Sequence, residues 1–139
     1  MSAPVGEEDA AVLEVNRAFY AAFEARDMDA MSDVWEHSDR AVCTHPGWAS
    51  LRGWGAISGS WFALFQGPQH LQFVLTREEV DVSGDTAWVT VDENLLGDQG
   101  GATVAALNLF SRSEDDGRWR MVAHHGSPVS RTVGSSPED

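Results

Sequence analysis

The stretch HLQFVLTREEVDV, residues 70–82, is where the spacing of apolar residues in this chain changes. Before it, apolar residues recur every three or four positions, as they do on one face of a helix. Within it they alternate with polar residues, as they do in a strand with one buried face. The segments 86–96, 102–112 and 118–125 share this character. We therefore predict a meander of four antiparallel strands. Turns are expected between them, at residues 83–85, 97–101 and 113–117.

The part of the chain before residue 70 is predicted to be mainly helical. Residues 7–27 have apolar side chains at helical spacing and begin with acids that suit the positive end of a helix. Asp27 is typical of an N-cap and predicts a second, short helix that ends near Trp35. A short strand at residues 40–45 follows, and the spacing from Trp54 onward predicts a third helix.

This order of elements predicts the α+β class. We expect a cone-shaped, strongly curved antiparallel sheet packed against three N-terminal helices. The apolar interior of such a cone is a natural pocket for a small molecule. No internal repeat or linker interrupts the pattern, so we expect a single domain over residues 1–139. Its core is expected at about residues 7–129, followed by a flexible tail at 130–139 that is rich in Ser, Pro and Gly.

Composition excludes several classes of function. The 22 acidic and nine basic residues give a net charge of -13, which disfavours nucleic acids and anionic membranes as partners. The chain contains no lysine, so lysine-based covalent catalysis is excluded. The N-terminus lacks the basic start and apolar core of a signal peptide, and no apolar run reaches the roughly 18–20 residues of a membrane span. We therefore expect a cytoplasmic protein.

The segment CTHPGW, residues 43–48, is the densest cluster of reactive groups, and no acidic residue occurs between residues 40 and 77. His45 can act as a general base, because an unperturbed imidazole titrates at about pH 6.5. The alternative is a structural histidine that braces the turn at Pro46. Cys43 lies two residues back on the same strand face, but that spacing rarely gives a working Cys–His pair. It is expected to be a small buried residue.

Several other side chains are candidates for the pocket. Trp48, Trp54 and Trp61 can form flat walls around an apolar or cyclic ligand, although Trp54 and Trp61 are also suitable for the core. Asn108 interrupts the apolar run VAALNLF, residues 104–110, and a buried amide needs a partner. That partner is either a ligand carbonyl or a backbone group.

His124 and His125 are adjacent in the last predicted strand. Consecutive strand residues point to opposite faces, so the two rings are not expected to bind one metal ion. We expect no metal and no cofactor. Alternation from Trp119 and Met121 predicts that His125 faces the cavity and that His124 faces the opposite side of the sheet.

Three segments resemble the nuclear transport factor 2-like superfamily, which includes SnoaL-like cyclases and ketosteroid isomerase. They are ARDMDAMSDVWEHSDRAVCTHPG at 25–47, LRGWGAISGSW at 51–61 and DGRWRMVAHHGSP at 116–128. The resemblance extends over about residues 7–129. The last segment is also similar to the association domain of calcium/calmodulin-dependent kinase.

The resemblance implies roles for particular residues. Ketosteroid isomerases have a general-base Asp before a Pro at the end of the first strand, and His45 occupies the matching position. Their oxyanion tyrosine corresponds most closely to Phe19, with Tyr20 one position further on. Their protonated Asp corresponds to Asn108 or a neighbour. His45, Asn108 and Tyr20 are therefore the candidate catalytic residues, and Phe19, the three tryptophans and His125 are the candidate ligand contacts.

Two functions remain open from the sequence. The first is a cofactor-independent isomerase, cyclase or dehydratase that acts on an apolar carbonyl compound with His45 as base. The second is a non-catalytic ligand-binding or assembly module. In either case, apolar residues occur on both faces of the predicted strands, with Val74 opposite Phe73 in one strand and Trp88 opposite Val89 in the next. We therefore expect a homodimer that covers the outer face of the sheet.

Overall fold

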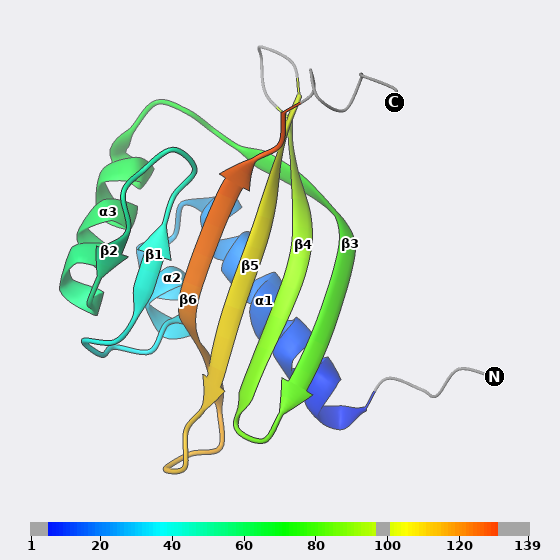
Figure 1. Cartoon of the computed structure of the whole chain (residues 1–139). Helices are drawn as coiled ribbons and strands as arrows, with labels where there is room; N and C mark the ends of the chain where they lie inside the picture. The colour runs from blue at the N-terminus through cyan, green and yellow to red at the C-terminus, as the bar shows by residue number, and fades with distance from the viewer. Residues whose placement is uncertain (1–5, 97–100, 131–139) are drawn as a thin grey trace.

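The structure is a computed structural model that describes residues 6–96 and 101–130. Its elements follow in chain order: α1 (Glu7–Ala25), α2 (Met28–Val34), β1 (Val42–Thr44), β2 (Leu51–Arg52), α3 (Trp54–Gln66), β3 (Gln72–Ser83), β4 (Thr86–Leu96), β5 (Ala102–Arg112) and β6 (Trp119–Pro128) (Figure 1). Residues 97–100 of the turn predicted at 97–101 lie outside the described residues. The same holds for residues 131–139 of the tail predicted at 130–139.

The predicted α+β fold is confirmed, with two differences in the sheet. The six strands form one sheet in the order β2-β1-β6-β5-β4-β3, and β3 to β6 make the predicted antiparallel meander. β1 pairs with β6 in parallel, so the sheet is mixed. β2 lies between the strand predicted at 40–45 and the helix predicted from Trp54, where no strand was expected, and it pairs with β1 over two residues only.

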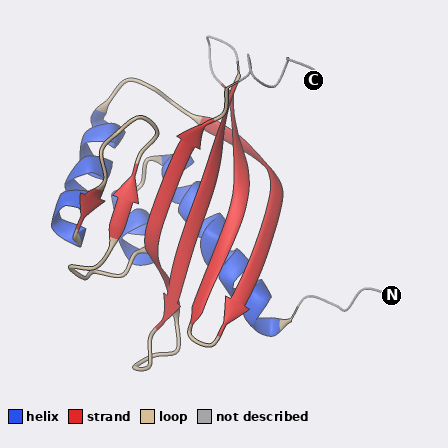
Figure 2. Ribbon diagram, viewed as in Figure 1, coloured by secondary structure: helices blue, strands red, loops and turns tan. Residues whose placement is uncertain are grey.

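The helices lie on one face of the sheet. α1 crosses behind the four long strands, and α3 lies next to β1 and β2 (Figure 2). The predicted cap of α2 is present, since the Asp27 carboxylate accepts a hydrogen bond from the Ala30 amide at 3.1 Å. Among the described residues, no helix has the length and hydrophobicity needed to cross a membrane.

The core fills the space between α1 and the inner face of the sheet. Phe19 at the centre of α1 is completely buried, and its ring makes edge contacts with Tyr20 and Trp61. Val89 on β4 and Phe110 on β5 close the core from the sheet side. Four buried polar residues lie within this apolar core, Asn16, Glu93, Asn108 and His124.

A β-bulge in β3 changes which of its residues face the core. The register with β4 shifts between Thr76 and Glu79, and Arg77 has a positive φ of 56°. Before the bulge, alternation turns Phe73 inward. After it, Glu78 faces inward, although strict alternation from Phe73 would direct Glu78 to the outer face.

A second bulge in β6 makes the prediction for the two adjacent histidines wrong. Phe110 pairs with Met121 but Leu109 pairs with Ala123, so one residue of β6 has no partner. This extra residue reverses the alternation that Trp119 and Met121 establish. His124 is therefore buried on the inner face, and His125 is exposed on the outer face.

Gly126 is held closely between two neighbours near the end of β6. A Cβ atom at this position would lie 3.0 Å from Val104 Cγ1 and 3.2 Å from Pro46 Cγ. Val104 lies on the inner face of the sheet, and Pro46 directly follows His45 in the turn after β1. The absence of a side chain at Gly126 therefore allows the turn after β1 to pack against the sheet.

We expect Gly126→Ala to lower the free energy of unfolding by about 1–3 kcal/mol, because the methyl group overpacks this contact. The matched control is Gly59→Ala in α3, where a Cβ meets nothing within 4 Å. That substitution should raise stability by about 0.5–1 kcal/mol through helix propensity. Urea denaturation of the two variants measures both effects, and equal effects of the same sign would contradict the assignment.

Candidate active site in the inner cavity

A cavity of about 290 Å³ opens between α1, α3, the turn after β1 and the ends of the long strands. Most of its wall is apolar and includes Phe23, Trp48, Phe65, Leu71, Phe73 and Leu95. Besides the Arg26 guanidinium, which donates to the Gly67 and Gln69 carbonyls, three titratable side chains line it, His45, Glu93 and His124. This combination of an apolar wall with a few convergent ionisable groups is typical of a site that binds and changes a small molecule.

His45 directly follows β1 and is only 3% exposed. Its Nε2 lies 2.9 Å from Ser60 Oγ, and the Ser60 hydroxyl donates its hydrogen to the Ile57 carbonyl at 2.7 Å. A serine hydroxyl has one hydrogen, so Nε2 must be the donor to Ser60. Nδ1 of His45 therefore carries a lone pair. Burial lowers the pKa of His45 to about 4, which keeps the ring neutral at neutral pH.

The surroundings of His45 leave it as the reactive group of the CTHPGW segment. Its ring makes edge contacts with Trp48 and Trp61, at 4.7 Å between ring centroids in each case. Cys43 Sγ lies 3.7 Å from Nε2, but burial raises the pKa of the thiol to about 12. The thiol therefore stays protonated, and no thiolate forms to act as a nucleophile.

Glu93 on β4 is a buried carboxyl that the sequence analysis missed. It is 3% exposed, and Tyr20 Oη donates a hydrogen bond of 2.5 Å to its Oε2. Burial raises the pKa of Glu93 from 4.5 to about 7, so the carboxyl carries a proton in part of the molecules at neutral pH. The pKa of Tyr20 is raised far above its ordinary value by burial and by Glu93, so Tyr20 stays a donor.

A signal for Glu93 was present in the sequence. Val89, Val91 and Glu93 alternate along β4, and the first two are core residues. A carboxyl in that series has to be buried, and a buried carboxyl is either paired or functional.

His124 on β6 is the third titratable residue of the cavity. Its Nδ1 lies 2.6 Å from Asn108 Oδ1, and no hydrogen bond to its Nε2 occurs within residues 6–96 and 101–130. Burial, with a further contribution from His45, lowers the pKa of His124 to about 3. His124 is therefore neutral at physiological pH.

The predicted catalytic residues take different positions. His45 lines the cavity. Tyr20 contacts Glu93 but does not line the cavity itself. Asn108 is completely buried, and its amide hydrogens go to Asn16 Oδ1 at 2.9 Å and Tyr20 Oη at 3.1 Å. The expected partner of Asn108, a ligand carbonyl or a backbone group, is therefore wrong, because both amide hydrogens go to the side chains of Asn16 and Tyr20.

The predicted ligand contacts are only partly in the cavity. Trp48 lines it and is 44% exposed. Trp61 and Phe19 are completely buried behind the wall, as core residues. Trp54 lies elsewhere and stacks on His37 with 4.4 Å between ring centroids. His125 lines a separate hollow on the outer face of the sheet.

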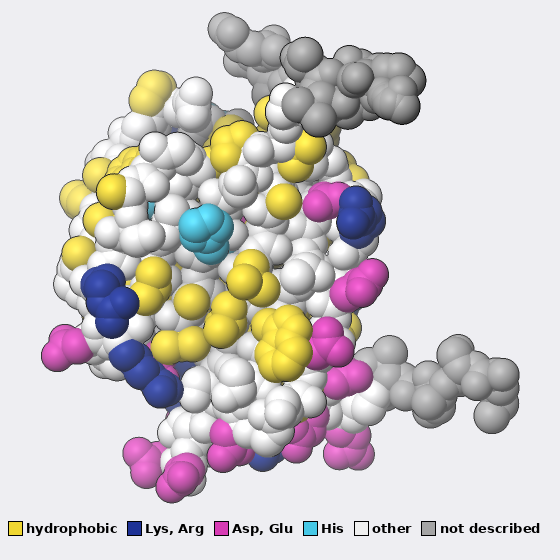
Figure 3. Space-filling view, viewed as in Figure 1, with side chains coloured by type: hydrophobic (Ala, Val, Ile, Leu, Met, Phe, Trp, Pro, Cys, Tyr) yellow, Lys and Arg dark blue, Asp and Glu magenta, His cyan; other side chains and the backbone are white. Residues whose placement is uncertain are grey.

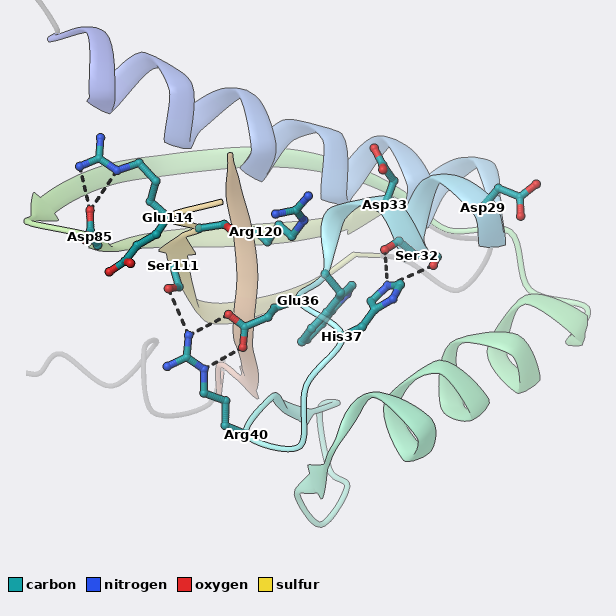
Figure 4. A pocket seen from close by; sticks show the side chains of 13 residues that line it. Asp29, Ser32, Asp33, Glu36, His37, Arg40, Asp85, Ser111, Glu114 and Arg120 are labelled. Carbon is teal, nitrogen blue, oxygen red and sulfur yellow. Dashed lines mark hydrogen bonds and ion pairs between the residues drawn. The ribbon is translucent and has the colours of Figure 1, made fainter. Parts of the chain in front are cut away.

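A larger polar hollow of about 750 Å³ lies between α2, the segment after it and the ends of β4 and β5 (Figure 4). Its three arginines each pair with a carboxylate, Arg120 with Asp116 at 2.7 Å. Arg40 makes two hydrogen bonds of 2.7 Å to the Glu36 carboxylate, and Arg112 pairs with Asp85 at 2.8 Å. Because these cations are already neutralised, we place the candidate site in the smaller, less polar cavity. Among the described residues, no group of three or more His, Cys, Asp or Glu side chains is arranged to hold a metal ion.

Comparison with known proteins identifies the class to which this fold and cavity belong. Residues 12–131 match the SnoaL-like domain family, and the chain belongs to that family. A proposed ketosteroid isomerase from Shewanella frigidimarina has the same fold, with a TM-score of 0.75 over 87% of this chain and 98% of that chain. The two sequences are 17% identical.

Two solved structures are similar in sequence as well as in fold. A proposed dehydratase of the nuclear transport factor 2-like family from Streptomyces avermitilis is 37% identical, with a TM-score of 0.78 over 87% of this chain and 95% of that chain. A proposed calcium/calmodulin-dependent protein kinase type II association domain from Thiobacillus denitrificans is 33% identical, with a TM-score of 0.76 over 92% and 100%.

A curated protein also matches, the F-box protein SKIP8 of Arabidopsis thaliana. It is 31% identical over 117 residues, which are 84% of this chain and 49% of that protein. The chain thus spans about half the length of the curated relative.

The raised pKa of Glu93 predicts a pH dependence of stability. Between pH 4.5 and about 7, the folded chain binds the Glu93 proton more tightly than the unfolded chain does, so the free energy of unfolding falls as pH rises. The lowered pKa values of His45 and His124 act in the opposite direction. Their contribution is common to the wild type and a Glu93 variant, so it cancels in the difference.

We expect the wild type to lose about 2–3 kcal/mol relative to Glu93→Gln between pH 4.5 and 8. Denaturant unfolding at a series of pH values measures the difference. Glu79→Gln on the outer face is the matched control and should follow the wild type. A difference that stays constant with pH would show that folding does not raise the pKa of Glu93.

Proposed function

We propose that the chain is an enzyme that removes water from, or isomerises, a small and largely apolar carbonyl compound in the inner cavity. The observation that carries this proposal is that a neutral imidazole and a carboxyl that can hold a proton line the same largely apolar cavity. Groups of these two kinds are the acid and the base that proton transfer at carbon requires. The 37% identity to the proposed Streptomyces avermitilis dehydratase supports the same class of reaction.

His45 is the proposed base. Its Nε2 is held by Ser60, so Nδ1 is the nitrogen that can accept a proton from the carbon next to the substrate carbonyl. The C–H electron pair then forms the new C=C bond. The neutral His45 imidazole is a weak base, because its conjugate acid has a pKa of about 4. It is effective here because the ring is already neutral and desolvated.

Glu93 is the proposed acid. In dehydration, the C–O bond to the β-hydroxyl breaks and the hydroxyl leaves with the Glu93 proton as water. The Tyr20 hydroxyl donates to the resulting carboxylate and stabilises it. Proton transfer from the His45 imidazolium to Glu93, through water, completes the cycle. In isomerisation, His45 returns its proton to a different carbon of the same substrate.

The test is conversion of β-hydroxycyclohexanone into cyclohexenone, followed by the ultraviolet absorbance of the conjugated product. His45→Gln and Glu93→Gln should each lower the rate by about a hundredfold or more, because each removes a group that transfers a proton. Both substitutions conserve volume and polarity, so the fold should be retained.

His125→Gln is the matched control, because this histidine lies on the outer face, and its rate should equal that of the wild type. Full activity of His45→Gln would exclude His45 as the base. A wild-type chain that binds the compound without converting it would support the second candidate, a ligand-binding or assembly module.

That second candidate is favoured by the outer face of the sheet and by the 33% identity to a proposed association domain. Hydrophobic side chains gather over the middle of this face, with acidic side chains toward its rim (Figure 3). Val74 and Leu107 are 48% and 40% exposed there. We propose that a second copy of the chain covers this face, since a two-fold axis brings the same apolar centre of each copy together.

Leu107→Arg should convert the proposed dimer into a monomer of 15.1 kDa in light scattering, because it places a charge in the centre of the apolar surface. Phe62→Arg is the control, since Phe62 is 57% exposed on α3 and lies away from the sheet face. A monomeric wild type at micromolar concentration would contradict the dimer without affecting the assignment of the cavity.

A further inference from the structure

One buried amide, Asn108, connects two of the three titratable residues of the cavity. It bonds to His124 on one side and, through Tyr20, to Glu93 on the other. The donors and acceptors in this network can be assigned from the outside inward, because the outermost member can only accept.

The outermost member is Glu78, which pairs with Arg17 at 3.2 Å. A carboxylate accepts hydrogen bonds and does not donate them. Asn16 must therefore direct its Nδ2 toward Glu78, at 2.8 Å, and its Oδ1 toward Asn108. The amide of Asn108 then has one possible orientation, with Nδ2 toward Asn16 and Oδ1 toward His124.

This orientation determines the tautomer of His124. Asn108 Oδ1 is an acceptor, so His124 Nδ1 must carry a hydrogen and donate it over 2.6 Å. In a neutral imidazole the other nitrogen is then without a hydrogen. His124 lines the cavity, and Nε2 is the nitrogen that remains for a bound molecule.

The same orientation determines the proton of Tyr20. The second Nδ2 hydrogen of Asn108 goes to Tyr20 Oη at 3.1 Å, so the tyrosine hydrogen is directed to Glu93 Oε2. Oε1 of Glu93 is the oxygen that remains to carry the carboxyl proton. His124 therefore offers an acceptor to the cavity, and Glu93 offers a donor.

We infer that Asn108 is a positioning residue that fixes both of these protons, and that the cavity consequently selects a carbonyl compound that also carries a hydroxyl group. The hydroxyl hydrogen is donated to His124 Nε2, and the hydroxyl oxygen accepts from Glu93, the acid that protonates it in the proposed dehydration. This inference deepens the proposed function and rests on its choice of cavity. Asn108 does not touch the ligand and acts through His124 and Tyr20.

The first test is nitrogen-15 NMR of the imidazole rings in the full chain without a ligand. The wild type should show one His124 tautomer, with hydrogen on Nδ1 and a bare Nε2, across the neutral pH range. Exposed His125, whose ring has no hydrogen-bond partner within the described residues, is the internal control. Hydrogen on Nε2, or a mixture of tautomers, at His124 would overturn the inference.

Asn108→Asp changes the central group with almost no change in volume. The new carboxylate accepts from His124 Nδ1 and stabilises the charged ring, so His124 should gain a second hydrogen near neutral pH. Asn94→Asp, on the outer face of β4, is the matched control and should leave the His124 signals unchanged. An unchanged His124 in folded Asn108→Asp would contradict the role of Asn108.

If Asn108→Asp does not fold, Tyr20→Phe tests one arm of the network alone. It removes the bond to Glu93 and leaves the bonds from Asn108 to Asn16 and His124. The His124 tautomer should be retained. Loss of that tautomer would show that His124 is held by something other than the amide orientation of Asn108.

The ligand part is tested by calorimetric binding of β-hydroxy-α,α-dimethylcyclohexanone and of α,α-dimethylcyclohexanone. The blocked carbon prevents loss of water, so binding is measured without turnover. The hydroxy ketone should bind about tenfold more tightly, as one hydrogen bond to a desolvated acceptor allows. Asn108→Asp should abolish this preference. Equal affinities in the wild type would overturn the ligand class, whereas absence of turnover with β-hydroxycyclohexanone would contradict only the proposed function.

Discussion

The hydrogen-bond network from Glu78 through Asn16 and Asn108 to His124 is the constraint on which the interior depends. An amide buried in an apolar core costs several kcal/mol if it lacks partners, so each member has to be placed against the next within hydrogen-bond distance. Asn16 comes from α1, and the other three come from β3, β5 and β6. Satisfying the network therefore fixes how the helix crosses the sheet, in addition to the apolar contacts of Phe19.

Burial also decides the protonation of the cavity. The same loss of water lowers the pKa of His45 and His124 and raises the pKa of Glu93, since in each case the neutral form is favoured. The result is a cavity in which two imidazole acceptors and one carboxyl donor are neutral, while the Arg26 guanidinium that also lines it donates to backbone carbonyls. Such a cavity accommodates an apolar compound and provides an acid and a base in one space near neutral pH.

Two β-bulges bring these polar groups inside. The bulge at Arg77 turns Glu78 toward α1, and the bulge before Ala123 turns His124 toward the cavity. Without the second bulge, His125 would take the inner position and the network would end at Asn108. One extra residue in β6 thus decides whether His124 lies in the cavity or in solvent.

Local sequence determined the order of the elements, the cap at Asp27 and the place of His45 at the end of a strand, because helical spacing, capping and Pro-Gly turns depend on neighbouring residues. It also determined that Asn108 needed a partner. Only the tertiary structure decided that this partner is His124, that Tyr20 meets Glu93 across 73 positions of the chain, and that Trp54 lies away from the cavity. These features depend on strand register and on bulges. A bulge is set by how two strands pair, and that pairing involves residues far apart in the chain, which the alternation within one strand does not reveal.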